Sequence, residues 1–550
     1  MAEAVAHEGA AAESGGLAER AFVPAVAGCA AAVAAFLAWR LTAWPPHEDE
    51  TLALFVGRDS LDGMLGTVLN QRGGAPLHFL FAWAVAHAGG GLDALRAVSA
   101  LFAVSSVPLI AVLCARLAGR GPALVATVLA SASWMLLFHG VYGRMYSLFL
   151  CTSLLSYLAL LEATERGGRR RWAAWILATL FCVAAHPYGA LVLATQVVYV
   201  AATRLRVREA AGSLAAVLVL GIPFWRTDLV LAGRFEIGVG GGGDRLGSPL
   251  DVVRYLGETL GDVTAGYRLI VALVLVAGVL GGYRLARERP RSAILVGAVV
   301  LTPGVLLMIA RFGSAAAPES RHLVFAMPFA LTAIATGIVS SARRLGGYAV
   351  PAIAVSVAGL LAAQLAWGWS RTPELYRGEA ASRVAARAAA AEWLAETSRP
   401  DDVLFGYDPL FLQAWREGGA LSRSVVPRAD SRLALRELQA ADPLGRGLWV
   451  FDASDTGNRI RRLHVPNRPP RPREAFETRA FGPFLVVRTV EPTGDVRSYL
   501  RLARRAQLAG KALGIADADT NLLTVLEAGG RLAAQERERR EDASRSSVSR

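Results

Sequence analysis

The chain is organised around the stretch Trp44-Pro-Pro-His-Glu-Asp-Glu-Thr-Leu-Ala-Leu-Phe55, which directly follows the first long apolar run. It places the carboxylates of Glu48, Asp49 and Glu50 beside a segment long enough to cross a membrane. Acids at the end of a span are costly unless they stay hydrated or bind something, so this cluster is a candidate functional site. The alternative is a solvated first helical turn, for which Pro46 and the acids are also suited.

The composition around this stretch is that of a polytopic membrane protein. Of the 550 residues 54% are hydrophobic and only 19% are charged, whereas a soluble protein of this length would carry more charge. Apolar runs of about 20 residues, the length that spans a bilayer, recur along the chain. The net charge of +13 is mostly arginine in short clusters between these runs, which is typical of topology determinants. We therefore predict membrane lipids, and no nucleic acid, as partners.

The apolar runs predict about eleven membrane spans. They lie at 22–43, 94–116, 121–138, 146–163, 172–186, 189–204, 210–225, 267–284, 292–310, 322–341 and 348–369. Basic clusters occupy alternate connections, at 116–120, 166–171, 204–208, 284–291 and 343–344. Placing them all in the cytoplasm makes residues 1–21 a cytoplasmic N-terminal tail. The run 76–87 is too short to span comfortably and predicts an interfacial or re-entrant helix.

This topology collects polar side chains on the outer face. The outer connections are the loop 44–93, the turn 139–144, residues 186–188, the loop 226–266 and residues 311–322. They carry acids, histidines, tyrosines and arginines, whereas the cytoplasmic loops offer little beyond arginine. We expect an outward-facing cavity at the membrane surface, with the loop 226–266 and its Gly240–Gly243 run closing over it.

The composition changes after the last span. Residues 371–510 combine an Ala-rich amphipathic helix at 385–397 with apolar runs of strand length that begin at Val403, Gly447 and Phe484. Alternation of helix and strand predicts a small extracytoplasmic α/β domain. Residues 511–550 are predicted to be helical at first and then a disordered, charged tail.

Five short motifs follow the Asp49-Glu50 pair along the chain. They read Ala75-Pro-Leu-His-Phe-Leu, Leu95-Arg-Ala-Val-Ser, Tyr142-Gly-Arg-Met-Tyr-Ser-Leu, His186-Pro-Tyr-Gly and Glu319-Ser-Arg-His-Leu. Taken in this order, and over about residues 22–345, the motifs resemble the GT-C superfamily of integral-membrane glycosyltransferases, and most closely the protein O-mannosyltransferase and aminoarabinose-transferase branch. The resemblance implies an enzyme of the plasma (inner) membrane with its active site outside the cytoplasm. Such an enzyme moves a hexosyl or pentosyl group, with inversion, from a polyprenyl-phosphate-sugar lipid donor to a glycan, lipid or protein acceptor.

The resemblance also implies roles for individual residues. Asp49 corresponds to the family's first-loop acid and is the predicted general base, with Glu50 as a neighbour that orients the acceptor or raises the pKa of Asp49. Arg321 is the predicted ligand of the donor phosphate, because a guanidinium gives bidentate contacts to phosphate oxygens. Arg144 and His186 are predicted to assist it. The remaining substrate-binding candidates are Tyr146, Tyr188, His78, Arg96, Glu319 and His322.

Each of these residues also has a simpler interpretation. Arg321 and Arg144 suit interfacial arginines at span ends, Tyr146 suits a residue of the aromatic belt, and His186 suits a hydrogen-bonded core histidine.

Two departures from the family pattern limit the prediction. The second outer loop, Phe138 to Arg144, holds no carboxylate, so no metal ligand is predicted and a divalent cation is doubtful as a cofactor. The segment before Pro76 reads Arg72-Gly-Gly-Ala and lacks the lysine of aminoarabinose transferases, which leaves the sugar open.

Two other classes of function remain as alternatives. One is a transporter or flippase of an isoprenoid-linked substrate, which should carry ionisable residues near the middle of its spans. The other is a non-catalytic membrane scaffold, which would leave the acids at 48–50 without a function.

Overall fold

The computed structural model describes residues 2–44, 47–236, 248–310, 319–377, 381–405, 425–426, 431–441, 443–453 and 464–513. The chain forms two compact units. The helical unit comprises Met1–Thr42, Gly73–Leu229 and Gly242–Thr372. The mixed unit comprises Ala43–Arg72, Val230–Gly241 and Pro373–Arg550. The predicted Gly240–Gly243 lid and the predicted tail beyond residue 513 lie outside the described residues.

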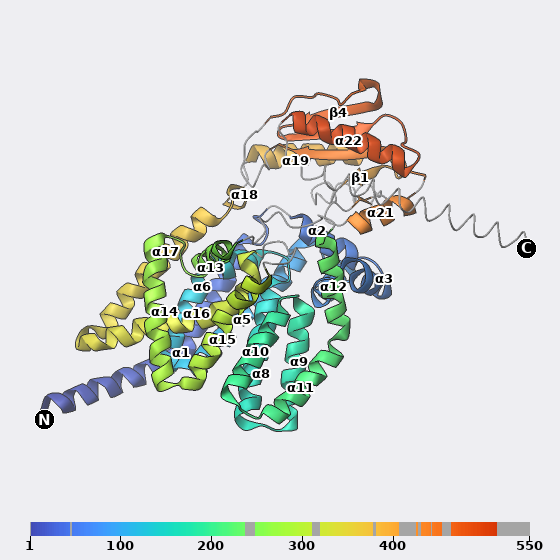
Figure 1. The fold of residues 1–550 in the computed structure, drawn as a ribbon. Helices are drawn as coiled ribbons and strands as arrows, with labels where there is room; N and C mark the ends of the chain where they lie inside the picture. The colour runs from blue at the N-terminus through green and yellow to red at the C-terminus, as the bar shows by residue number, and fades with distance from the viewer. Residues whose placement is uncertain are drawn as a thin grey trace, which may run out of the picture. The chain divides into compact units, whose positions relative to one another are not determined.

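The helical unit is a bundle of long apolar helices (Figure 1). Its elements are α1 (Ala2–Arg40), α4 (Pro76–His87), α5 (Leu92–Ala118), α6 (Arg120–Ala132), α7 (Trp134–Val141), α8 (Tyr146–Arg166), α9 (Arg169–Ala185), α10 (Gly189–Thr203), α11 (Val207–Leu220), the first half of α12 (Ile222–Glu236), α13 (Pro249–Val263), α14 (Arg268–Glu288), α15 (Pro290–Ala310), η2 (Ser320–Ala326), α16 (Met327–Ala342), η3 (Arg343–Tyr348) and α17 (Ala349–Arg371).

These helices confirm the predicted polytopic α-helical class. Among the described residues, six helical stretches are long and apolar enough to cross a membrane, or up to eight if each of two bent helix pairs is one span. The bent pairs are α6 with α7, at 48°, and α11 with α12, at 59°. The second bend follows from Pro223, which cannot donate a backbone hydrogen bond and so starts a new helix.

The predicted loop 226–266 is therefore largely helical in its described part. Helix α12 continues to Glu236 and α13 begins at Pro249. Similarly, α7 extends the predicted span through His139 to Val141, so His139 lies on a helix and not in a turn.

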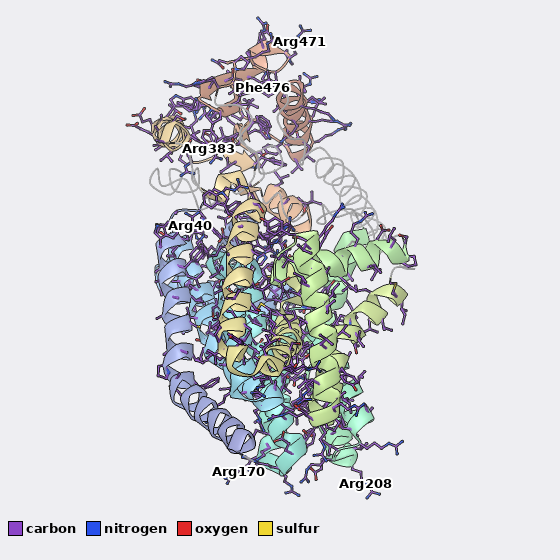
Figure 2. The ribbon with its side chains drawn as sticks, turned by 90° about the vertical axis from the view of Figure 1, so that its left-hand side faces the viewer. Arg40, Arg170, Arg208, Arg383, Arg471 and Phe476 are labelled. Atoms are coloured by element: carbon purple, nitrogen blue, oxygen red, sulfur yellow. The ribbon has the colours of Figure 1, made fainter. Side chains whose placement is uncertain are left out.

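The basic clusters meet at one end of the helical unit. Arg116 forms ion pairs with Glu162 at 2.9 Å and Glu165 at 2.7 Å, and Arg289 donates to the carbonyl of Arg116. The clusters at 166–171 and 204–208 join this end through Glu162 and Glu209. Figure 2 shows Arg170 and Arg208 at this end and Arg40 at the opposite end of the bundle.

Neutral side chains form a network of hydrogen bonds between α8, α9 and α10. Gln196 of α10 donates to Ser156 of α8 at 2.8 Å and accepts from Trp175 of α9 at 2.9 Å. The Ser156 and Thr179 hydroxyls are 2.9 Å apart. Because buried polar groups are costly without partners, this network fastens α8, α9 and α10 to one another.

The mixed unit contains a five-stranded sheet in the order β2-β1-β3-β5-β4. The strands are β1 (Val403–Phe405), β2 (Val425–Val426), β3 (Gly447–Asp452), β4 (Phe476–Phe481) and β5 (Phe484–Thr489). Strand β1 pairs in parallel with β2 and β3, whereas β5 pairs antiparallel with β3 and β4. The predicted α/β class of this part of the chain is confirmed.

Helices cover both faces of this sheet (Figure 1). The helices of the mixed unit beyond residue 373 are α18 (Glu374–Arg377), α19 (Ala381–Thr397), α21 (Ser431–Ala440), η4 (Arg473–Ala475) and α22 (Val496–Ala512). Side chains alternate along each strand, so Leu404 packs with Trp393 of α19, whereas Phe405 packs with residues of α21 and α22.

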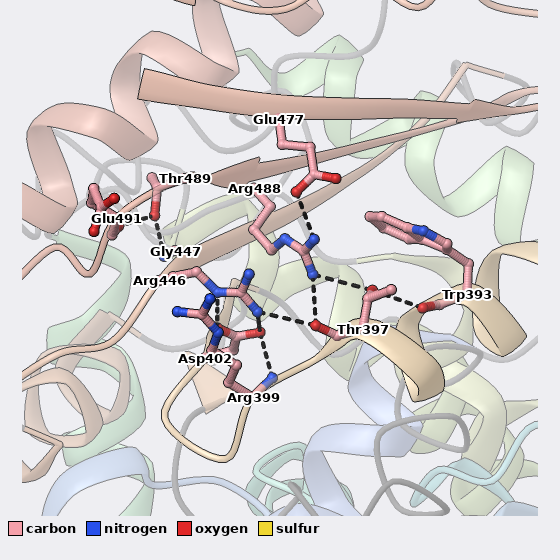
Figure 3. Close-up of polar contacts among 10 residues, drawn as sticks. All are labelled: Trp393, Thr397, Arg399, Asp402, Arg446, Gly447, Glu477, Arg488, Thr489 and Glu491. Atoms are coloured by element: carbon pink, nitrogen blue, oxygen red, sulfur yellow. Dashed lines mark hydrogen bonds and ion pairs between the residues drawn. The ribbon is translucent and has the colours of Figure 1, made fainter. Parts of the chain in front are cut away.

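Two arginines of the sheet region form hydrogen bonds with the C-terminal end of α19 (Figure 3). Arg446 and Arg488 donate to the Thr397 carbonyl at 3.1 and 3.0 Å, which places positive charge at the C-terminus of the helix. Arg446 also makes two 2.7 Å hydrogen bonds to Asp402, whose side chain is fully buried.

The acidic stretch packs within the mixed unit. Most of it lies in the short helix α2 (Glu48–Gly57), which is followed by α3 (Leu61–Thr67) and the π-helix η1 (Val68–Arg72). Arg436 of α21 donates to Gln71 at 2.9 Å and to Thr67 at 3.3 Å. The rings of Trp44 and Tyr376 are in edge contact at 5.4 Å. Residues far along the sequence thus contact both this stretch, at Trp44, and the helices that follow it.

Candidate functional site

Asp49 and Glu50 lie in the first turn of α2. His47 is the N-cap residue, and its Nδ1 accepts a hydrogen bond from the Asp49 amide at 3.1 Å. The Glu50 carboxylate is buried and accepts from the His47 amide at 2.9 Å, which completes a capping box. The helix-start interpretation therefore accounts for one hydrogen bond of Glu50. The Asp49 side chain is 26% exposed, and its Oδ2 lies 3.6 Å from Nδ1 of His47.

The main cluster of predicted residues lies in the helical unit, around the ring of Tyr146. The guanidinium carbons of Arg144 and Arg321 lie 5.4 and 5.0 Å from the centre of this ring. Tyr146 is the first residue of α8, whereas Arg321 belongs to η2, so the two arginines come from separate parts of the chain. Each contact has the geometry of a cation–π interaction, and together they concentrate positive charge at one site.

Histidines surround the same ring. His139, His186 and His322 have ring centres 5.3, 5.7 and 6.0 Å from that of Tyr146. Tyr188 joins them, with its ring 4.9 Å from His322 and 5.5 Å from His186.

Hydrogen bonds fix the tautomer of two of these histidines. Nδ1 of His186 accepts from the Tyr188 amide at 3.0 Å, and Nδ1 of His322 accepts from the Glu319 amide at 3.1 Å. A neutral imidazole whose Nδ1 accepts carries its hydrogen on Nε2, so each ring offers one further donor. Two further buried nitrogen atoms, His139 Nδ1 and Arg321 Nε, have no hydrogen-bond partner in the described part of the chain. The cluster is therefore rich in donors and suited to an anion.

Glu319 provides the acid that contacts this cluster. Its carboxylate accepts from Arg321 Nη2 at 2.6 Å and is 56% exposed, whereas the Arg321 side chain is 19% exposed. The Tyr255 hydroxyl donates to the Glu319 carbonyl at 3.0 Å. Burial raises the pKa of Tyr255, so this hydroxyl stays protonated and keeps its donor role.

Two other predicted residues are held elsewhere in the helical unit. Arg96 of α5 is fully buried and donates to the carbonyl of Leu41 at 3.1 Å, just beyond the end of α1. This contact favours a structural role, since it satisfies a backbone group that the end of a helix exposes. His78 of α4 is buried in edge contact with Phe79.

Three residues that contact this region were not among the predicted site residues. Asp262 and Tyr255 lie on α13, and Ser320, which stands within the motif Glu319-Ser-Arg-His-Leu, precedes Arg321. Their side-chain hydrogen bonds join residues that are 58 to 109 positions apart, so no local pattern reveals these contacts. His139 stood in a predicted outer turn but was not among the predicted site residues.

No group of three or more histidine, cysteine, aspartate or glutamate side chains that could hold a metal ion occurs among the residues that the structure describes. The donors around Tyr146 are nitrogen atoms of arginine and histidine.

Comparison with solved structures confirms the predicted GT-C fold. The chain resembles ArnT from Cupriavidus metallidurans in its apo state (TM-score 0.50, 15% identity, 85% of this chain and 97% of that one). The structure of the same protein bound to undecaprenyl phosphate is similar to the same degree (TM-score 0.50, 14% identity, 85% and 98%). The arabinofuranosyltransferase AftD from Mycobacteria also matches (TM-score 0.50, 15% identity), over 84% of this chain and 40% of its own. No protein-family profile and no curated protein sequence matches the chain.

Proposed function

We propose that the chain is an integral-membrane glycosyltransferase that uses a polyprenyl-phosphate-linked sugar on the outer face of the membrane. The observation that carries the proposal is the pair of guanidinium groups, of Arg144 and Arg321, at the Tyr146 ring. Arginine is the side chain best suited to phosphate. The likeness in fold to ArnT, which has been solved bound to undecaprenyl phosphate, supports a ligand of this class.

In the proposed reaction the acceptor oxygen attacks the anomeric carbon, and the bond from that carbon to the phosphate oxygen breaks with inversion. The acceptor proton passes to the Asp49 carboxylate, and the electron pair leaves with the polyprenyl phosphate. Arg321, assisted by Arg144 and His186, stabilises the charge that grows on the phosphate. In this proposal Tyr146, Tyr188 and His322 contribute to the phosphate site. The Glu319 carboxylate, which accepts from Arg321 Nη2, gives way to the incoming phosphate.

The transporter alternative has less support. A transporter should carry ionisable groups near the middle of its spans, but the contacts between α8, α9 and α10 are made by the neutral side chains of Ser156, Thr179, Gln196 and Trp175.

The test is sugar transfer by the purified protein in lipid, with a panel of polyprenyl-phosphate sugars and donor binding measured separately. Asp49→Asn should bind donor and transfer at least about a hundredfold more slowly, as removal of a general base requires. Arg321→Ala should weaken donor binding, whereas Arg254→Ala, an exposed arginine of α13, should behave as wild type.

Two results would contradict the proposal. Equal transfer by wild type and Asp49→Asn would remove Asp49 as the base. Failure of the wild type to bind any donor of the panel would favour a transporter or scaffold.

A further inference from the structure

Asp262 is a buried carboxylate near the end of α13, with a side chain only 1% exposed. Four hydrogen bonds satisfy it. Oδ1 accepts from Arg371 Nε at 3.0 Å and from Trp367 Nε1 at 3.3 Å. Oδ2 accepts from the Ser320 hydroxyl at 2.6 Å and from Arg371 Nη2 at 3.3 Å. A buried charge is tolerated only when it is paired in this way, so the position of each donor is tightly constrained.

The Ser320 contact is the one that reaches the candidate site. Ser320 is the first residue of η2, and Arg321 follows it directly. A hydroxyl that donates to a carboxylate forms a short, strong hydrogen bond, and 2.6 Å lies in that range.

A second contact from α13 holds the same segment. The Tyr255 hydroxyl donates to the carbonyl of Glu319, one residue before Ser320. Residues 319 and 320 are thus anchored to α13 at two points, one on the backbone and one on a side chain. The start of η2, from which the Arg321 side chain extends to the Tyr146 ring, is fixed by this helix.

We propose that Asp262 is a positioning residue, which holds Arg321 in its phosphate-binding position through the Ser320 hydroxyl. The proposal rests on the proposed function, in which Arg321 binds the donor phosphate. Asp262 does not touch the substrate. Its role is to limit the freedom of η2, because an arginine on a loose segment loses more conformational entropy when it binds.

The test uses two variants of Ser320 that match in size and differ in one hydroxyl group. Ser320→Thr keeps the donor to Asp262, and Ser320→Val removes it. Ser320→Val should raise the Kd for polyprenyl phosphate about tenfold, as loss of a hydrogen bond to a charged group predicts. Ser320→Thr should remain within about twofold of wild type. The rate at saturating donor should change less than the KM for donor.

The same pair in an Arg321→Ala background shows whether the effect passes through Arg321. If it does, Ser320→Val and Ser320→Thr should bind donor equally there, because the side chain that Ser320 positions is gone. Thermal melts of all variants separate this effect from a loss of folding.

The outcomes distinguish this inference from the proposed function. If Arg321→Ala binds donor as tightly as wild type, the proposed function loses its phosphate ligand. If Arg321→Ala weakens binding but the valine and threonine variants are equal in the wild-type background, the positioning role is overturned and the proposed function stands. The positioning role is also overturned if the loss in Ser320→Val persists undiminished without Arg321.

Discussion

The backbones of Gly281 on α14 and Gly337 on α16 are in direct contact, and a Cβ atom on Gly281 would lie 2.6 Å from the nitrogen of Gly337. Ala277 and Ala333 lie one helical turn before these glycines, so small residues line both sides of the contact. Helices in a membrane often associate through such surfaces, since close approach maximises van der Waals packing.

Gly281→Ala should therefore destabilise the protein by about 1–3 kcal/mol, the usual range for overpacking against groups that cannot move away. A lower thermal unfolding midpoint of the purified variant, compared with wild type, would show this loss of stability. The control is Gly282→Ala on the same helix, where an added Cβ meets no atom within 4 Å. Equal midpoints for the two variants would contradict the expected contact.

Glu319→Gln should tighten the binding of polyprenyl phosphate. The Glu319 carboxylate occupies Arg321 Nη2 at 2.6 Å, where a phosphate oxygen would bind. Because the acid is half exposed, the pair contributes at most about 1 kcal/mol, so the Kd should fall by a factor of about five or less. Titration with polyprenyl phosphate measures it. A rise in Kd would instead assign Glu319 a favourable contact with the ligand.

Tyr146→Leu should weaken donor binding more than Tyr146→Phe. The aromatic face lies against two guanidinium groups, and a phenylalanine keeps this face while losing the hydroxyl. A cation–π contact is worth about 0.5–2 kcal/mol, which predicts a Kd between about twofold and thirtyfold higher for the leucine variant. If the phenylalanine variant binds as weakly as the leucine variant, the hydroxyl and not the ring is the important group.

Arg446→Leu should strongly destabilise the sheet of the mixed unit. It would leave the Asp402 carboxylate buried without its cation, which costs about 3–5 kcal/mol in comparable cases. Limited proteolysis of the full chain, with cleavage sites mapped to residues 373–513, would measure the loss. Arg501→Met on the exposed face of α22 is the matched control and should leave the cleavage rate unchanged.

The pH dependence of stability should differ in sign between Glu437→Gln and Asp495→Ala. Burial raises the pKa of Glu437, although Arg436 opposes the shift, so the ionised acid lowers stability above about pH 4.5. Glu437→Gln should raise the thermal midpoint at pH 7, with a gain that vanishes near pH 4. If the midpoint of Glu437→Gln exceeded that of wild type by the same amount at every pH, ionisation of Glu437 would not be the cause of the difference.

Asp495 provides the opposite case. Hydrogen bonding from the Ser498 amide lowers the pKa of this N-cap carboxylate, so it stabilises the fold above its usual pKa of 3.8. That contribution is lost as the pH falls through the lowered value. Asp495→Ala should lower the midpoint at pH 7, since an N-cap is worth about 1 kcal/mol, and the difference should shrink in acid.

The helical architecture could be predicted because membrane spans have a local signal. A run of about 20 apolar residues and an arginine cluster at its end are visible without any partner. Ser320 and Asp262, in contrast, are 58 residues apart. Ser320 lies within the motif Glu319-Ser-Arg-His-Leu, but nothing in the sequence links it to Asp262. Their contact depends on how α13 packs.

Most residues of the candidate site could also be predicted from local motifs. Arg144, Tyr146, His186 and His322 each stand in a short motif at the outer end of a predicted span, which is why they could be named together.

Two features of the fold are not evident from hydropathy. The bend at Pro223 was missed because hydropathy does not change there, although the proline itself was a visible signal. Strand β4 was missed because its exposed Glu477 and Arg479 interrupt the apolar pattern.

The contacts of Arg436 with Thr67 and Gln71, and of Tyr376 with Trp44, bear on how truncations of this protein should be interpreted. A chain cut after Thr372 would lose both partners of the segment that carries Asp49. Inactivity of such a fragment would therefore not identify the C-terminal domain as the binding site of the acceptor. Point substitutions at Arg436 and Tyr376, which remove these contacts and leave the domain in place, would separate the two roles.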